Sequence, residues 1–103
     1  MKRRLIGLLL IALTFDVSSA YAVPDCSKPN KTKTEWMLCS SDKAAVADQL
    51  MAAAFRDAFN RVKDQEALLK EQEEWSRDVR DACNDVPCLV KVYRDRANAL
   101  ETY

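Results

Sequence analysis

The sequence lacks histidine altogether and contains a single glycine, Gly7, among its 103 residues. Without histidine, the chain has no imidazole to act as the general base for a serine or cysteine nucleophile. The nitrogen ligand of most mixed-ligand zinc sites is missing for the same reason. Asn-Gly and Gly-Gly pairs are also absent, so the tight turns of β-hairpins are not supplied. These absences disfavour nucleophilic hydrolases, zinc proteins and antiparallel sheets.

The long apolar run of the sequence lies at its N-terminus. It covers residues 5–15 and directly follows three basic residues at positions 2–4. A run of this length is too short for a transmembrane anchor but matches the hydrophobic part of a cleaved secretory signal. The Ala-Tyr-Ala sequence at 20–22 then predicts the cleavage site. We therefore interpret residues 1–22 as a signal peptide and residues 23–103 as one periplasmic or secreted domain.

A strong excess of charge of one sign is absent too. The predicted mature domain keeps 13 of the 16 basic and 15 of the 16 acidic residues, which gives a net charge of −2. Nucleic-acid binders usually carry a clear basic excess, so we expect no nucleic-acid partner. No lipoprotein cleavage sequence precedes Cys26, so we expect no membrane anchor once the signal is removed. A slightly acidic domain permits a basic protein as partner.

Four cysteines are present in the predicted mature domain: Cys26, Cys39, Cys83 and Cys88. An even number in a small exported domain predicts two disulfides. Of the three possible connectivities, we favour Cys26–Cys39 and Cys83–Cys88, because each closes a local loop that helices can bracket. Loop-closure entropy suggests about 3 kcal/mol of stabilisation for the longer loop and about 2 for the shorter. Zinc binding and dithiol redox chemistry are the alternatives, and the lack of a Cys-x-x-Cys spacing disfavours both.

Good helix formers dominate the domain, and strand-like alternation is absent. We predict an all-α fold, a small disulfide-stapled bundle of helical hairpins with three longer helices and one short N-terminal helix. The predicted helices cover residues 33–39, about 42–62, about 65–83, and a last segment that has Pro87 in its first turn. Thr32 and Glu35 have the spacing of a capping box at the start of the first of them. The short connections make neighbouring helices antiparallel.

Residues spaced three and four apart mark the predicted core faces of the three longer helices. These faces comprise Ala44, Ala47, Met51, Phe55, Ala58, Phe59 and Val62, then Leu68, Gln72, Trp75, Val79 and Ala82, and finally Leu89, Tyr93, Ala97 and Leu100. A buried amide must find hydrogen-bond partners, so we favour a structural role for Gln72. Arg80 and Arg96 are expected to form structural ion pairs. Their candidate partners include Asp48 and Asp81.

The two tryptophans have different expected positions. Trp75 lies on an apolar helix face and is expected to anchor the core. Trp36 lies on the short disulfide-bracketed helix, where it either packs or is displayed. Lys28, Lys31 and Lys33 form a basic segment close to it, which is either solvated or inserts a cation into an acidic cleft of a partner.

No residue is predicted to be catalytic or to bind a metal, and no cofactor is expected. The acid-rich stretch at 71–85 has basic residues at helical spacing, which favours a solvated, charge-paired face. Glycosidase chemistry needs two carboxylates in different environments within a cleft, and the sequence does not mark such a pair. Calcium binding is also disfavoured, because a helix does not wrap its carboxylates around one ion.

The order and spacing of many residues resemble the LprI-like lysozyme-inhibitor domain, a family of small exported four-cysteine helical proteins. The matching residues are Cys26, Glu35, Cys39, Asp48, Met51 and Phe55, followed by Gln72-x-x-Trp75, Arg80-Asp81-Ala82-Cys83, Cys88-Leu89, Tyr93, Arg96 and Leu100. The resemblance covers nearly the whole predicted mature domain. The sequence departs from the family pattern at Ala44 and Ala47, where leucine is usual, and at Phe55, where tyrosine is frequent.

The resemblance implies a protein-binding role, because some members of this family are linked to inhibition of lysozyme. We therefore expect an inhibitor that occludes the cleft of a lysozyme-type muramidase, with a c-type lysozyme as the candidate partner. The residues expected to contact it are Lys28, Lys31, Lys33 and Trp36. One alternative is an envelope adaptor or assembly factor that binds another envelope protein. Another is a small enzyme acting on peptidoglycan. Folding alone explains most of the matched positions, so we expect these residues to be structural.

Overall fold

The computed structural model describes residues 24–103, so the predicted signal peptide and its cleavage site lie outside the described residues. All regular structure in the described part is helical, which confirms the predicted all-α class. The elements are α2 (Lys33–Ser40), α3 (Asp42–Arg61), α4 (Gln65–Asp78), the 3-10 turn η2 (Arg80–Ala82) and α5 (Val86–Leu100). Three longer helices and one short N-terminal helix are present, as predicted.

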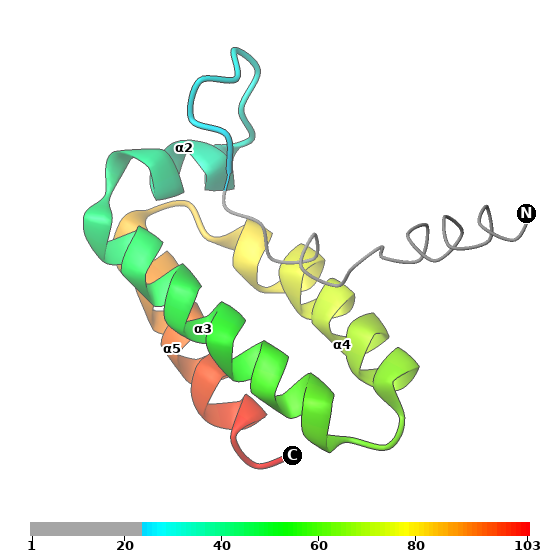
Figure 1. Ribbon diagram of the computed structural model, residues 1–103. Helices are drawn as coiled ribbons and strands as arrows, with labels where there is room; N and C mark the ends of the chain where they lie inside the picture. The colour runs from blue at the N-terminus through cyan, green and yellow to red at the C-terminus, as the bar shows by residue number, and fades with distance from the viewer. Residues whose placement is uncertain (1–23) are drawn as a thin grey trace, which may run out of the picture.

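The three longer helices lie side by side, and α2 lies across one end of them (Figure 1). The chain descends along α3, returns along α4 and descends again along α5, so consecutive long helices are antiparallel and α3 is parallel to α5. The closest packing is between α3 and α5. Helix α2 contacts α3 and η2, which places the N-terminal segment over the α4–α5 connection.

Each helix begins at a residue whose side chain caps it. The hydroxyl of Thr32 accepts a hydrogen bond from the backbone N–H of Glu35, whose carboxylate accepts one from the N–H of Thr32. This is the predicted capping box. Ser41, Asp64 and Asp85 cap α3, α4 and α5 by accepting from the N–H three residues further along. Polar residues with short side chains therefore set the helix starts directly.

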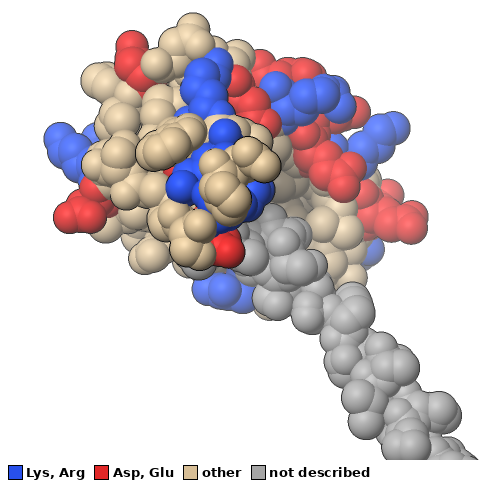
Figure 2. Space-filling view, turned by 90° about the horizontal axis from the view of Figure 1, so that it is seen from above, with Lys and Arg blue, Asp and Glu red and all other residues tan. Residues whose placement is uncertain are grey.

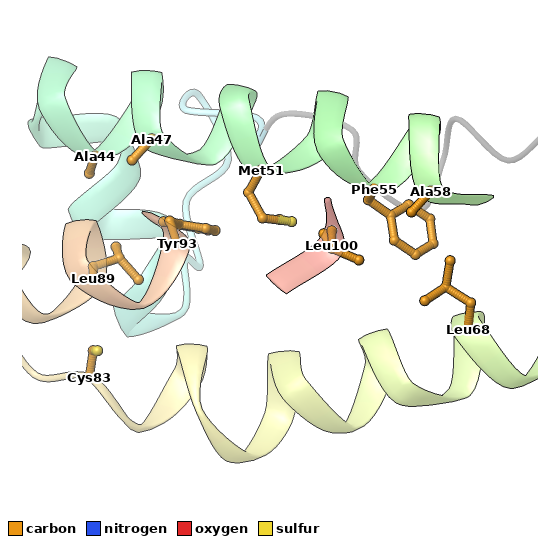
Figure 3. Close-up of a cluster of buried hydrophobic side chains, with 10 residues drawn as sticks. All are labelled: Ala44, Ala47, Met51, Phe55, Ala58, Leu68, Cys83, Leu89, Tyr93 and Leu100. Carbon is orange, nitrogen blue, oxygen red and sulfur yellow. The ribbon is translucent and has the colours of Figure 1, made fainter. Parts of the chain in front are cut away.

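The core lies mainly between α3 and α5, and α4 covers one side of it. Its buried residues are Ala44, Ala47, Met51, Phe55, Ala58, Leu68, Cys83, Leu89, Tyr93 and Leu100. Figure 3 shows Ala44 and Ala47 facing Leu89 and Tyr93 of α5. Two small side chains on α3 thus leave room for a fully buried tyrosine, which keeps the packing dense while the helices lie close together. This accommodation gives a physical reason for alanine at both positions.

Helix α4 is shorter than predicted. It ends at Asp78 instead of continuing to residue 83, and the predicted core residues Val79 and Ala82 are exposed, Val79 to 40%. The chain continues as the 3-10 turn η2, which rotates more per residue than an α-helix and shifts the spacing of the apolar face. Cys83 then adopts an extended backbone, and this change of direction brings it to the first turn of α5.

The two disulfides join the cysteines in the pairs predicted from the sequence. Cys26 and Cys39 are joined with Cα atoms 5.7 Å apart, and Cys83 and Cys88 with Cα atoms 5.6 Å apart. The first bond ties the N-terminal loop to the last turn of α2, and the second ties the connection after η2 to the start of α5. Two disulfides indicate a non-reducing compartment. No helix within residues 24–103 has the length and apolar character needed to cross a bilayer.

Candidate functional site

The residues predicted to contact a partner gather at one end of the molecule. We call Lys28, Lys31, Lys33 and Trp36 the end surface; they belong to the N-terminal loop and to α2. Figure 2 looks onto this end of the molecule and shows Lys and Arg side chains near the middle of the view. Trp36 is 57% exposed, so of the two alternatives for this residue the structure has the displayed one.

Lys31 and Trp36 form a pair on this surface. The Lys31 Nζ lies 4.4 Å from the centroid of the Trp36 ring and also donates a hydrogen bond of 2.9 Å to the carbonyl of Lys28. An ammonium group over an indole face is a favourable cation–π arrangement. Within the described residues Lys31 forms no ion pair, although its charge helps to lower the pKa of Asp25, and its ammonium group can still meet an acidic group from outside.

The other two lysines of the end surface are engaged within the protein. The Lys28 Nζ lies 3.2 Å from the Glu35 carboxylate, and the Lys33 Nζ donates a 2.6 Å hydrogen bond to the side-chain oxygen of Asn84. The backbone N–H of Thr32, and then Lys28, hold the pKa of Glu35 below its usual value. These contacts fasten the loop to α2, and α2 to the turn before α5. Lys28 and Lys33 therefore help to hold the end surface in place.

A polar pocket of about 220 Å³ lies where α2, α3, α4 and η2 meet. Its polar side chains include Thr34, Asp48, Gln72, Ser76, Arg80 and Asp81. Burial raises the pKa of Asp48, while Tyr93 and the positive charge of Arg80 act in the opposite direction. Three residues of the family pattern that are distant in sequence, Asp48, Arg80 and Tyr93, thus influence one another electrostatically.

The hydroxyl of Tyr93 is fully buried beside the side chains of Asp48 and Arg80, but within the described residues it forms no hydrogen bond of regular geometry. Burial raises its pKa, the negative charge of Asp48 adds to the rise, and Arg80 opposes it. The hydroxyl thus lies in a polar corner of the core, and the ring packs among the buried apolar side chains. Its ring centroid lies 5.7 Å from that of Trp75.

Arg80 and Asp81 form an ion pair of 2.8 Å at the edge of the pocket. Asp81 also accepts a 2.9 Å hydrogen bond from the hydroxyl of Thr34, which is buried on α2. Burial alone would raise the pKa of Asp81, but the hydrogen bonds from Arg80 and Thr34 outweigh it and lower the pKa. Asp81 therefore connects η2 to α2 through its hydrogen bond from Thr34.

Arg96 is only 8% exposed, and its side chain joins α5 to α4. Its Nε donates a 2.8 Å hydrogen bond to the amide oxygen of Gln72, and a terminal nitrogen lies 3.3 Å from the carboxylate of Glu71. The amide nitrogen of Gln72 in turn donates to the sulfur of Met51 on α3 at 3.1 Å. Gln72 thus links all three long helices, and its partners lie inside the bundle.

Sequence reasoning missed an apolar surface on the outside of α3. Val46 and Leu50 are 54% and 61% exposed, although both are large and aliphatic. They lie outside the predicted core face, and their four-residue spacing is the signal that would have identified a second stripe on the same helix. In residues 24–103 no group of three or more histidine, cysteine or acidic residues is placed to hold a metal ion.

Comparison with known proteins adds no relative: no protein-family model, no curated protein and no solved structure matches the chain. The fold and the two disulfides define a small, disulfide-bonded, all-α protein of a non-reducing compartment. The polar residues of its pocket are mostly bonded to one another, whereas the Lys31–Trp36 pair faces outward.

Proposed function

We propose that this protein is exported to the periplasm or beyond and inhibits a lysozyme-type muramidase by covering its substrate cleft. The observation that carries the proposal is the Lys31–Trp36 pair, in which an ammonium group that forms no ion pair within the described residues is held against an exposed indole ring. A muramidase cleft contains two catalytic carboxylates, which would attract the ammonium group. The indole ring supplies a large, rigid contact area beside it.

The way in which the end surface is fastened supports binding. The Cys26–Cys39 disulfide closes the loop that contains Lys28 and Lys31, and the hydrogen bond from Lys33 to Asn84 holds α2 against the rest of the bundle. A surface that is already ordered loses less conformational entropy when a partner binds. Such a surface suits occlusion of a cleft better than a flexible lysine-rich segment would.

The resemblance to the LprI-like domain supports a muramidase as the target. The residues that carry this resemblance, such as Gln72 and Arg96, bond to one another inside the bundle and so belong to the scaffold. The proposed contact residues, by contrast, lie outside that network. The target is therefore proposed from the family, and the contact surface from the geometry of this chain. Export would bring the protein to the compartment where muramidases meet peptidoglycan.

The test is lysis of a peptidoglycan suspension by a c-type lysozyme, with and without the purified, oxidised mature protein. Dose-dependent protection is expected, and it should disappear after reduction and alkylation. Trp36→Ala and Lys31→Ala should each weaken inhibition by about tenfold, because a central aromatic or cationic contact carries much of the binding energy. Lys70→Ala is the matched control, since Lys70 is also exposed and its removal changes the net charge equally.

A triple variant extends the test to the whole lysine segment. Lys28, Lys31 and Lys33 are replaced by alanine, and the matched control carries alanine at Lys63, Lys70 and Lys91. The first variant should lose inhibition while its helical circular dichroism persists, and the control should inhibit normally. Unchanged inhibition by the first variant would contradict this placement of the contact surface. No protection by the folded parent protein at large excess would remove c-type lysozyme as the target.

A second candidate function is an envelope adaptor or assembly factor that binds another envelope protein without inhibiting an enzyme. The observation that favours it is the exposed pair Val46 and Leu50, which lies on α3 and shares no residue with the end surface. Affinity purification from envelope extracts would then return one stable stoichiometric partner. Loss of that partner in a Leu50→Gln variant, with Trp36→Ala as control, would favour this function over inhibition.

A further inference from the structure

A groove runs along the outside of the bundle between α3 and α5. Three adjoining hollows of about 460, 290 and 290 Å³ make it up, and Arg94 lines all three. Lys43 lines two of them, as do Ala47 and Leu50, so the hollows are continuous. We call this surface the α3–α5 groove. In Figure 1 the two helices that form it lie next to each other.

The apolar part of the groove follows one line along α3. Val46, Leu50 and Ala54 are spaced four residues apart, so they lie one above the other on the same face of the helix. Val46 and Leu50 are more than half exposed, and therefore contribute little to the core of this chain. Large aliphatic side chains gathered along a hollow are typical of a surface that another protein covers.

The charge of the groove is positive where its hollows join. Arg94 and Lys43 form no ion pair within residues 24–103, whereas the neighbouring Lys91 is neutralised by Asp95 at 2.7 Å. Two acidic residues of the groove, Asp42 and Glu101, form no ion pair with a basic residue within residues 24–103. Each of them lines only one of the three hollows. An occupant of the groove therefore meets apolar side chains along α3 and an unmatched cation near its centre.

We propose that the α3–α5 groove binds an amphipathic helix of another protein that presents aliphatic residues to Leu50 and a carboxylate to Arg94. Such a helix would lie along α3 from Asp42 to Ala54, a length of about 18 Å or roughly three helical turns. Helix-in-groove docking uses this combination of apolar anchors at four-residue spacing and flanking charge. Charge complementarity would set the choice of partner and speed the encounter.

The central arginine also argues against a second copy as the occupant. A symmetric dimer about the middle of the groove would bring Arg94 of one copy close to Arg94 of the other, and like charges facing each other disfavour association. The groove and the end surface share no residue. One protein could thus hold a partner along α3 and α5 while its end surface engages a different one, so the inference goes beyond the proposed inhibition.

The test uses three synthetic peptides of about 14 residues, enough for four turns of helix. The first has leucines at four-residue spacing flanked by glutamates, the second has lysine for every glutamate, and the third has the first composition in scrambled order. Each is labelled with a fluorophore, and fluorescence anisotropy follows binding to the oxidised mature protein at low salt. We expect micromolar binding of the acidic peptide, at least about tenfold weaker binding of the basic peptide, and none of the scrambled one.

Protein variants then locate the site. Leu50→Gln should lower the affinity for the acidic peptide by about tenfold. Arg94→Glu should reverse the preference, so that the basic peptide binds more tightly than the acidic one. Trp36→Ala is the matched control, because it removes an exposed apolar side chain outside the groove and should leave peptide binding unchanged. Conversely, Leu50→Gln should leave lysozyme inhibition unchanged, which separates a failure of this inference from a failure of the proposed function.

Several results would overturn the inference. They are the absence of saturable binding up to millimolar acidic peptide, equal binding of the scrambled peptide, and unchanged affinity in both groove variants. Sedimentation of the parent protein and of Leu50→Gln supplies an independent measurement. A concentration-dependent dimer that disappears in the variant would assign the groove to a second copy and refute the proposed occupant. A monomer in both samples, together with selective peptide binding, is the expected result.

Discussion

Replacing Arg96 by methionine should destabilise this protein far more than replacing an exposed basic residue. Arg96 is 8% exposed and donates to the amide oxygen of Gln72 at 2.8 Å. Methionine fills much of the same volume but leaves that oxygen inside the bundle without a donor, which costs about 1–3 kcal/mol. Losing the ion pair with Glu71 adds little to this cost, because Glu71 is 47% exposed and keeps its hydrogen bond from Tyr103. We expect a total cost of about 2 kcal/mol, a large share of the roughly 4–12 kcal/mol typical of a domain this size.

A double-mutant cycle tests this reasoning directly. Gln72→Leu alone should also destabilise, because it leaves the Nε of Arg96 without its 2.8 Å acceptor. Combining Arg96→Met with Gln72→Leu removes both partners, so the double variant should cost about 1–2 kcal/mol less than the sum of the single variants. Lys91→Met is the control, since Lys91 is 74% exposed and its i,i+4 pair with Asp95 contributes at most about 0.5 kcal/mol.

The measurement is urea unfolding of the oxidised mature proteins, followed by circular dichroism at a helix-sensitive wavelength. The slopes of the transitions of the parent and its four variants should agree, so that midpoints report stability alone. An Arg96→Met cost no larger than that of Lys91→Met would refute the assigned burial. Strict additivity in the cycle would show that Arg96 and Gln72 do not depend on each other, and the link between α4 and α5 would then have to come from apolar packing.

Three further predictions concern the same scaffold. Replacing Cys26 and Cys39 by serine should cost about 3 kcal/mol in urea unfolding, because the bond closes a loop with a sequence separation of 13. Asp48→Asn should stabilise the protein at neutral pH. Burial raises the pKa of Asp48 in the folded state, so the folded protein loses stability as pH rises and this carboxyl ionises. Asparagine does not ionise and avoids that loss. The gain should vanish in acid, where the carboxyl is protonated in both states, and a gain that persists there would contradict the assigned cause. Tyr93→Phe should change stability by less than about 1 kcal/mol, because the hydroxyl forms no hydrogen bond of regular geometry within the described residues; a larger loss would show that its interactions with Asp48 and Arg80 stabilise the fold.

Local signals in the sequence predicted much of the fold. The Thr32–Glu35 capping box and Pro87 in the first turn of α5 act within one helical turn, so the sequence indicates both. The cap at Asp85 was not predicted. The favoured disulfide pairing is also local, because each bond spans few residues. The end of α4 at Asp78 was missed, because no glycine or proline marks it and the break depends on how η2 directs the chain toward α5.

Contacts between distant residues were the harder part of the candidate site. Structural ion pairs were predicted for Arg80 and Arg96, and Asp81, one of the candidate partners, does pair with Arg80. Glu71 was missed as the partner of Arg96, because this pair depends on how α4 packs against α5. The display of Trp36 depends on α2 lying across the end of the bundle, which no periodicity encodes. The α3–α5 groove was missed because Val46 and Leu50 form a second apolar stripe on α3, outside the face that the spacing of the core residues marks.

The segment that carries α2 is bonded to the connection before α5 through side chains next to the second disulfide. Lys33 donates to Asn84, the neighbour of Cys83, and Thr34 donates to Asp81 two residues before it. The two disulfides thus brace opposite sides of one junction. In a reducing compartment both braces would open, and α2 would lose the support that orders the end surface. Oxidation of the four cysteines would therefore be the step that orders this end of the molecule.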